Sequence, residues 1–103
     1  ALKGDDAAAR TFFQRAMTIQ PNQPQALYQL ADMSYADKNY TAAQGYLRQY
    51  ARSSPATVDV LWLAVRVERK LGNSIAEQSY SQQLRKNYPD SKEAAALQTG
   101  QFD

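Results

Sequence analysis

The sequence predicts an all-α fold, an α-solenoid in which antiparallel helix pairs stack as a right-handed superhelix. Three observations predict it: a regular spacing of prolines, the same spacing among small and apolar residues, and helical periodicity between the prolines. Pro21, Pro55 and Pro89 follow one another at equal intervals. The same step relates Ala9 to Ala43, Phe13 to Leu47, Ala16 to Tyr50, Leu27 to Leu61, Leu30 to Ala64 and Ala31 to Val65.

The interval between the prolines is the length of the tetratricopeptide repeat, a helix-turn-helix unit that the sequence resembles. The stretch from Pro24 to Thr57 is a complete repeat, since the residues typical of the motif occur in order: Leu27, Leu30, Ala31, Tyr40, Ala43, Leu47 and Pro55. It departs from the motif at Ser34 and Tyr50. We therefore expect one tetratricopeptide domain made of half a repeat (1–23), two complete repeats (24–57 and 58–91), and a capping helix with a tail (91–103).

The helices follow from the points at which the pattern stops and restarts. They are expected at residues 6–19, 24–36, 41–52, 57–70, 74–87 and 91–99. Pro21 ends the first helix because proline lacks an N–H donor, whereas Pro24 suits the first turn of the second. Three helices are expected to begin with capping boxes, at Thr41–Gln44, Ser74–Glu77 and Asp90–Glu93. Ala76 follows Gly72 one residue sooner than the motif requires, which predicts a shorter turn.

The composition argues against an enzyme. The 103 residues are enough for about one domain, and they include no cysteine and no histidine. Thiol nucleophiles, disulfides, most zinc sites and the usual general base are therefore excluded. The 12 basic and 10 acidic residues are interspersed, which disfavours nucleic-acid binding. No Gly-rich phosphate loop is present, and Asp5 and Asp6 suit a helix start, so we expect no catalytic residue, cofactor or metal.

Protein binding remains as the expected activity, and repeats of this type bind partners mainly through the first helix of each repeat on the concave face. The residues placed on that face are two sets of three, each spaced by four and three along one helix: Tyr28, Asp32 and Tyr35, then Trp62, Arg66 and Arg69. Aromatic residues and arginine are frequent anchors of protein interfaces.

Purely structural roles for the same residues remain as alternative interpretations. Trp62 has about even odds of packing between helices. Arg66 and Arg69, with Lys70, also fit a solvated helix end favoured by the helix dipole. The tyrosines also fit a role in filling the inner groove. At the N-terminal edge, Phe12 and Phe13 lack a preceding helix to pack against, which predicts self-association through this edge.

Most of the chain also resembles the C-terminal repeats of the PilF/PilW family of type IV pilus biogenesis lipoproteins. The resemblance rests on the segment "ALYQLADMSYADKNYTAAQGYLRQYARSS", the contraction after Gly72, the closure "NYPDS" and the ending "LQTGQ". It implies a pilotin-like scaffold in the periplasm, held at the outer membrane, that helps the pilus secretin reach that membrane and form its multimer. The lipidated cysteine and further repeats of such proteins would lie upstream of Ala1.

Two other functions are kept as alternatives. In one, the repeats are the non-catalytic arm of a larger periplasmic enzyme, such as a cell-wall hydrolase or transferase, and a catalytic domain elsewhere in the gene product would favour it. In the other, they form a general co-chaperone scaffold. Asp32 disfavours the latter, because a clamp for a C-terminal carboxylate needs a neutral or basic group at that position.

Overall fold

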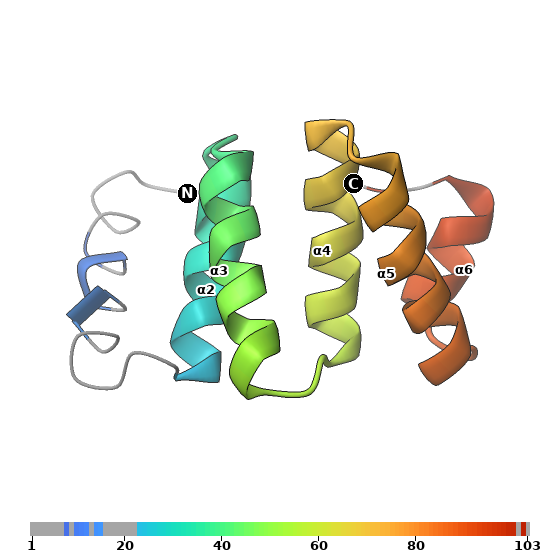
Figure 1. The fold of residues 1–103 in the computed structure, drawn as a ribbon, viewed down its shortest axis with the longest axis horizontal. Helices are drawn as coiled ribbons and strands as arrows, with labels where there is room; N and C mark the ends of the chain where they lie inside the picture. The colour runs from blue at the N-terminus through green and yellow to red at the C-terminus, as the bar shows by residue number, and fades with distance from the viewer. Residues whose placement is uncertain (1–7, 9, 13, 16–22, 101, 103) are drawn as a thin grey trace. The chain divides into compact units, whose positions relative to one another are not determined.

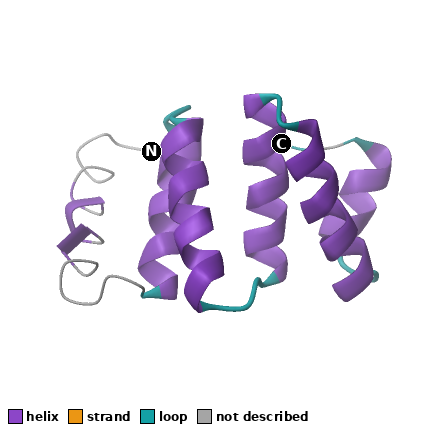
Figure 2. Ribbon diagram, viewed as in Figure 1, coloured by secondary structure: helices purple, strands orange, loops and turns teal. Residues whose placement is uncertain are grey.

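The computed structural model describes residues 8, 10–12, 14–15, 23–100 and 102. Within these residues all regular structure is helical, which confirms the all-α prediction (Figures 1 and 2). The helices with described bounds are α2 (Pro24–Ala36), α3 (Tyr40–Ser53), α4 (Val58–Leu71), α5 (Ser74–Asn87) and α6 (Lys92–Thr99). Residues 8, 10–12, 14 and 15 are also helical, and the rest of the expected helix at 6–19 lies outside the described residues.

The period inferred from the prolines reappears in the starting points of the helices. Helices α2, α4 and α6 begin at Pro24, Val58 and Lys92, which are separated by the same interval as the prolines. Helices α3 and α5 begin at Tyr40 and Ser74, again one full period apart. Helix α6 therefore begins in the register of a first helix of a repeat, although it is much shorter than α2 or α4.

The helices fall into two compact units, Ala1–Pro55 and Ala56–Asp103. In the first unit α2 and α3 form a hairpin, and an ion pair joins Arg10 to Asp37 at the end of α2. The motif positions of this hairpin are buried, as the repeat pattern requires: Leu27, Leu30, Ala31, Ala43 and Leu47 are between 0% and 5% exposed. Ser34 and Tyr50, the two departures from the motif, are buried as well.

The second unit combines the hairpin of α4 and α5 with α6 (Figure 1). Its core is one apolar cluster drawn from all three helices: Leu61, Val65, Leu84 and Leu97. The hydroxyl group of Tyr88, just after α5, donates a hydrogen bond of 3.2 Å to the carbonyl oxygen of Ala56, just before α4. This bond closes the hairpin at the end opposite its turn.

The turn between α4 and α5 has two residues, whereas the turn between α2 and α3 has three, so the turn is shorter as predicted, but the predicted contraction after Gly72 is wrong. The cause of the shorter turn is one additional residue at the end of α4, since α5 keeps its place one full period after α3. Each turn contains one residue in the left-handed region, Lys38 with φ 64° and Gly72 with φ 77°. A left-handed residue after the last turn of a helix is the usual way to satisfy its final carbonyl groups.

The predicted capping boxes are wrong at all three helices. The residue that caps α3 is Asn39 rather than Thr41, and its Oδ1 accepts a hydrogen bond of 3.3 Å from the N–H of Ala42. The residue that caps α6 is Ser91 rather than Asp90, through its Oγ at 3.0 Å from the N–H of Ala94. Helix α3 begins earlier than expected because the left-handed residue before Asn39 has already turned the chain.

At α5 the preceding residue is Asn73 rather than Ser74, and no side chain caps the helix. The amide of Asn73 instead donates a hydrogen bond of 2.8 Å from Nδ2 to Oε1 of Glu68. Glu68 is 3% exposed, so its carboxylate needs hydrogen-bond donors inside the protein. The side chain that would cap α5 is therefore used to solvate a buried acid.

Candidate protein-binding surface

Helix α4 presents the strongest group of predicted binding residues. Its start is fixed by Thr57, whose Oγ1 accepts a hydrogen bond of 3.3 Å from the N–H of Val60. Leu61 and Val65 enter the core of the second unit. Because the helical period is about 3.6 residues, Trp62, Arg66 and Arg69 then lie together on the adjacent face.

The face that carries Trp62 is already covered in part by Phe102 from the tail. The two rings are stacked, with centroids 5.8 Å apart and planes 11° from parallel. Both side chains are half-buried and pack against the core cluster of the second unit. Trp62 is therefore partly a packing residue, as one of the open interpretations held, and its role in binding a partner remains a prediction.

Two arginines contact these aromatic rings. The Cζ atom of Arg66 lies 5.6 Å from the ring centroid of Trp62, and that of Arg69 lies 4.1 Å from the ring centroid of Phe102. Both distances are within the range of cation–π attraction. Arg69 also pairs with Glu77 of α5, with Nη1 3.4 Å from Oε2. We call Trp62, Arg66, Arg69 and Phe102 the aromatic–arginine cluster.

Arg69, at the end of α4, is not only a solvent-exposed charge, because it also makes contacts within the protein. The Arg69 side chain is 52% exposed, yet its guanidinium group contacts a ring and a carboxylate. Arg69 also lies in the last turn of α4, where the helix dipole stabilises a positive charge. The interpretation of Arg69 as part of a dipole-stabilised helix end therefore also applies.

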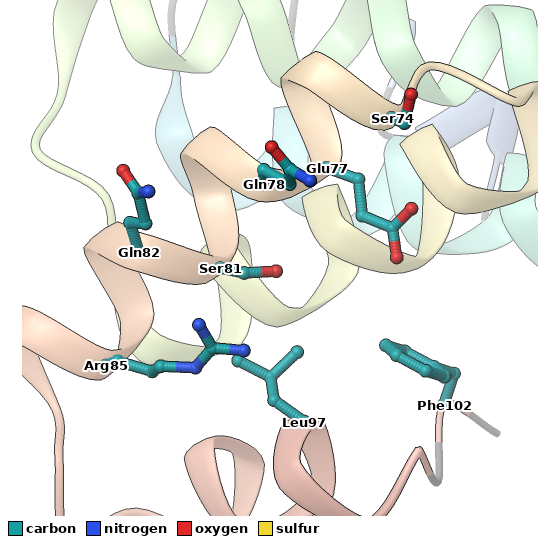
Figure 3. A pocket seen from close by; sticks show the side chains of 8 residues that line it. All are labelled: Ser74, Glu77, Gln78, Ser81, Gln82, Arg85, Leu97 and Phe102. Atoms are coloured by element: carbon teal, nitrogen blue, oxygen red, sulfur yellow. The ribbon is translucent and has the colours of Figure 1, made fainter.

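A hollow of about 500 Å³ lies beside the aromatic–arginine cluster (Figure 3). Helix α5 supplies one side, α6 supplies Leu97, and Phe102 forms part of the wall. The residues from α5 are all polar or charged: Ser74, Glu77, Gln78, Ser81, Gln82 and Arg85. Amides, hydroxyls and one charge of each sign suit hydrogen bonding to a polypeptide backbone and its polar side chains.

The predicted residues on α2 are arranged more simply. Tyr28, Asp32 and Tyr35 are all half-buried, and the ring of Tyr35 meets that of Tyr40 of α3 edge to face at 5.4 Å and 61°. These residues belong to the first unit, whereas Trp62, Arg66 and Arg69 belong to the second. Each trio shares one helix, and its role in binding remains a prediction.

The predicted N-terminal interface falls partly outside the described residues. Phe12 is 67% exposed, and Phe13 is not among the residues that the structure describes. Ile75, at the start of α5, is also strongly exposed at 86%. Self-association through Phe12 and Phe13 remains a prediction.

Sequence reasoning missed Phe102 and the polar face of α5. Phe102 lies beyond the last helix and outside the repeat, so the repeat period carried no information about its contacts. One local signal was available: Gly100 follows α6 with φ 74°, and such a glycine ends a helix and redirects the chain. No cluster of three or more acidic, histidine or cysteine side chains suited to a metal occurs within the described part of the chain.

The paired helices, their repeated register and the burial of the motif positions give the chain the fold of a tetratricopeptide-repeat protein. No protein-family model matches the chain. In sequence the chain is similar to the type IV pilus assembly protein PilF of Pseudomonas aeruginosa, with 27% identity over 92 residues. This match covers 89% of the chain and 36% of PilF.

Solved structures show the same relationship. The chain matches a structure of Pseudomonas aeruginosa PilF with a TM-score of 0.84 and 26% identity, over 92% of this chain and 43% of that one. It matches PilW, a widely conserved type IV pilus biogenesis factor, with a TM-score of 0.82 and 28% identity, over 92% and 44% of the two chains. The chain therefore spans less than half the length of these relatives.

Within the described residues, no helix combines the length and the apolar character needed to cross a membrane.

Proposed function

We propose that the chain is part of a non-catalytic scaffold that binds a protein partner during type IV pilus assembly. The observation that carries this proposal is the match to PilF and PilW over 92% of the chain, at TM-scores of 0.84 and 0.82. A repeat fold of paired helices with half-buried aromatic side chains and arginines in contact with them supports it, because such residues anchor protein interfaces. The polar face of α5 adds hydrogen-bonding groups next to them.

The proposed partner is the pilus secretin, and the proposed role is that of a pilotin that supports its localisation and multimerisation. The proposed site of action is the periplasmic side of the outer membrane, with a lipid anchor upstream of Ala1. These assignments follow from the family resemblance. The proposed contact residues are the two helix faces formed by Tyr28, Asp32 and Tyr35, and by Trp62, Arg66 and Arg69.

Capture of the secretin by the full-length protein tests this proposal. Two double variants divide the candidate surface: Tyr28→Ala with Tyr35→Ala, and Trp62→Ala with Arg66→Ala. We expect at least one of them to reduce capture about tenfold or more, since buried aromatic and arginine anchors each contribute about 1–4 kcal/mol to typical interfaces.

A matched control is Arg48→Ala with Arg52→Ala, since both arginines are exposed on α3 and lie outside the candidate faces. Circular dichroism establishes that each variant keeps its helices. Capture that is unchanged in both test variants would move the binding site elsewhere, and failure of the unmodified protein to capture the secretin would refute the proposed partner.

A further inference from the structure

The tail residue Phe102 occupies the same surface of α4 that carries Trp62. Its ring stacks on the indole and lies under the guanidinium group of Arg69, 4.1 Å from the Cζ atom. The same guanidinium group also pairs with Glu77 of α5. The surface is therefore shaped and charged to hold an aromatic ring, and the structure shows one in place.

Phe102 is held by ring stacking on Trp62 and by a cation–π contact with Arg69, and an aromatic ring from another molecule can make the same contacts. Helix α6 ends at Thr99, Gly100 turns the chain with φ 74°, and Phe102 follows soon after. Stacked aromatic pairs and exposed cation–π contacts each change an equilibrium constant by about two- to tenfold. An occupant held by such contacts is displaceable by a partner that brings an equivalent ring together with additional interactions.

Phe102 also forms part of the wall of the hollow lined by α5 (Figure 3). Gln78 and Gln82 also line this hollow, and the exposed Arg85 forms no ion pair within the described residues. A peptide whose aromatic side chain replaced Phe102 would therefore meet amides for its backbone and a guanidinium group for a carboxylate.

We infer that the aromatic–arginine cluster is a binding site for a protein segment that carries an aromatic residue next to an acidic one, and that Phe102 is its resident occupant. The ring of the partner displaces Phe102 from Trp62, and the carboxylate pairs with Arg85 in the hollow beside the cluster. This inference rests on the proposed function only for the identity of the partner. All residues of the proposed site belong to the second unit.

Intrinsic fluorescence tests the site directly, because Trp62 is the only tryptophan in the chain. The probe is a synthetic peptide with the sequence of the tail, QTGQFD, added to the full chain with and without Phe102→Ala. We expect Phe102→Ala to change the Trp62 emission and to strengthen peptide binding about five- to fiftyfold, because the competing ring is gone.

Three controls make the result specific. The variant Phe102→Tyr keeps a ring, so it should bind the peptide as weakly as the unmodified chain. The peptide QTGQAD should not bind, and Arg69→Gln combined with Phe102→Ala should weaken binding of the original peptide. Absence of a saturable fluorescence change in Phe102→Ala, or equal binding of both peptides, would overturn the inference.

The failures of this inference and of the proposed function are distinguishable. Peptide binding to Phe102→Ala without any secretin capture by the full-length protein would refute the proposed partner and support the site. Secretin capture without peptide binding would support the proposed partner and refute the site. A dimer, measured by light scattering, that is lost in Phe102→Ala would overturn the assignment to a partner protein, since the occupant would then be the tail of a second copy.

Discussion

Lys38 and Gly72 hold equivalent positions in successive repeats, and both adopt the left-handed backbone conformation. Their φ angles are 64° and 77°. In each turn the next residue donates its N–H back to the end of the preceding helix, at 2.8 Å after Lys38 and 2.9 Å after Gly72. The backbone requirement is therefore the same in both repeats, although only one of them satisfies it with glycine.

The first prediction follows from this pair. Lys38→Gly should raise the free energy of unfolding by about 0.5–1 kcal/mol. Removing the side chain relieves a cost of about 1–2 kcal/mol in the left-handed region, and part of this gain is lost because glycine makes the unfolded chain more flexible. Urea denaturation followed by circular dichroism measures the change. The matched variant Gly72→Ala should shift the midpoint in the opposite direction.

Apart from Gly72 and its neighbours along the chain, no heavy atom of the described residues lies within 4 Å of a Cβ built on Gly72, so the cost of Gly72→Ala is that of the backbone alone. If Gly72→Ala left the free energy of unfolding unchanged, the turn would have to relax out of the left-handed region in this variant.

The second prediction concerns the buried carboxylate of Glu68. Asn73→Ala removes the donor that lies 2.8 Å from its Oε1, and we expect a loss of about 1–3 kcal/mol in the free energy of unfolding. Asn39→Ala is the matched control, since Asn39 occupies the same position one repeat earlier and only caps a helix, at about 1 kcal/mol. Equal losses in the two variants, measured by urea denaturation, would mean that the bond to Glu68 adds nothing beyond a cap.

The third prediction concerns the closure of the second hairpin. Tyr88→Phe removes the hydroxyl that donates to the carbonyl oxygen of Ala56 and keeps the ring in place, so we expect a loss of about 0.5–1.5 kcal/mol. Tyr46→Phe, at another half-buried tyrosine, is the control and should change stability by less than about 0.5 kcal/mol. The comparison is made by thermal unfolding, and a larger effect at Tyr46 than at Tyr88 would contradict the prediction.

The fourth prediction tests whether α6 is part of the folded core. Leu97→Ala should lower the free energy of unfolding by about 2–4 kcal/mol, because Leu97 is 8% exposed and belongs to the cluster formed with Leu61, Val65 and Leu84. Gln98→Ala, on the exposed side of the same helix, should have little effect. If hydrogen exchange shows that Leu97→Ala frees α6 while α4 and α5 keep their protection, then α6 is a separable cap.

Much of the helical framework was predictable because every repeat has the same length and needs the same turn between its two helices. The bounds of α2 and α5 agree with the expected ranges 24–36 and 74–87, and the other described helices differ by one residue at one or both ends. The capping residues were not predictable from local spacing. Ser74 and Thr41 have the right neighbours for a cap, but the left-handed turn places an asparagine at that position instead.

The sequence by itself determined the repeat, the helix pairs and the burial of positions such as Leu27, Ala43 and Leu61, because periodicity and residue size are local properties of the chain. The tertiary structure alone decided that Phe102 stacks on Trp62 and that Asn73 bonds to Glu68 rather than capping α5. The first of these contacts joins residues far apart in the sequence. In the second, a buried charge outcompetes the free N–H groups of a helix end, which water can reach.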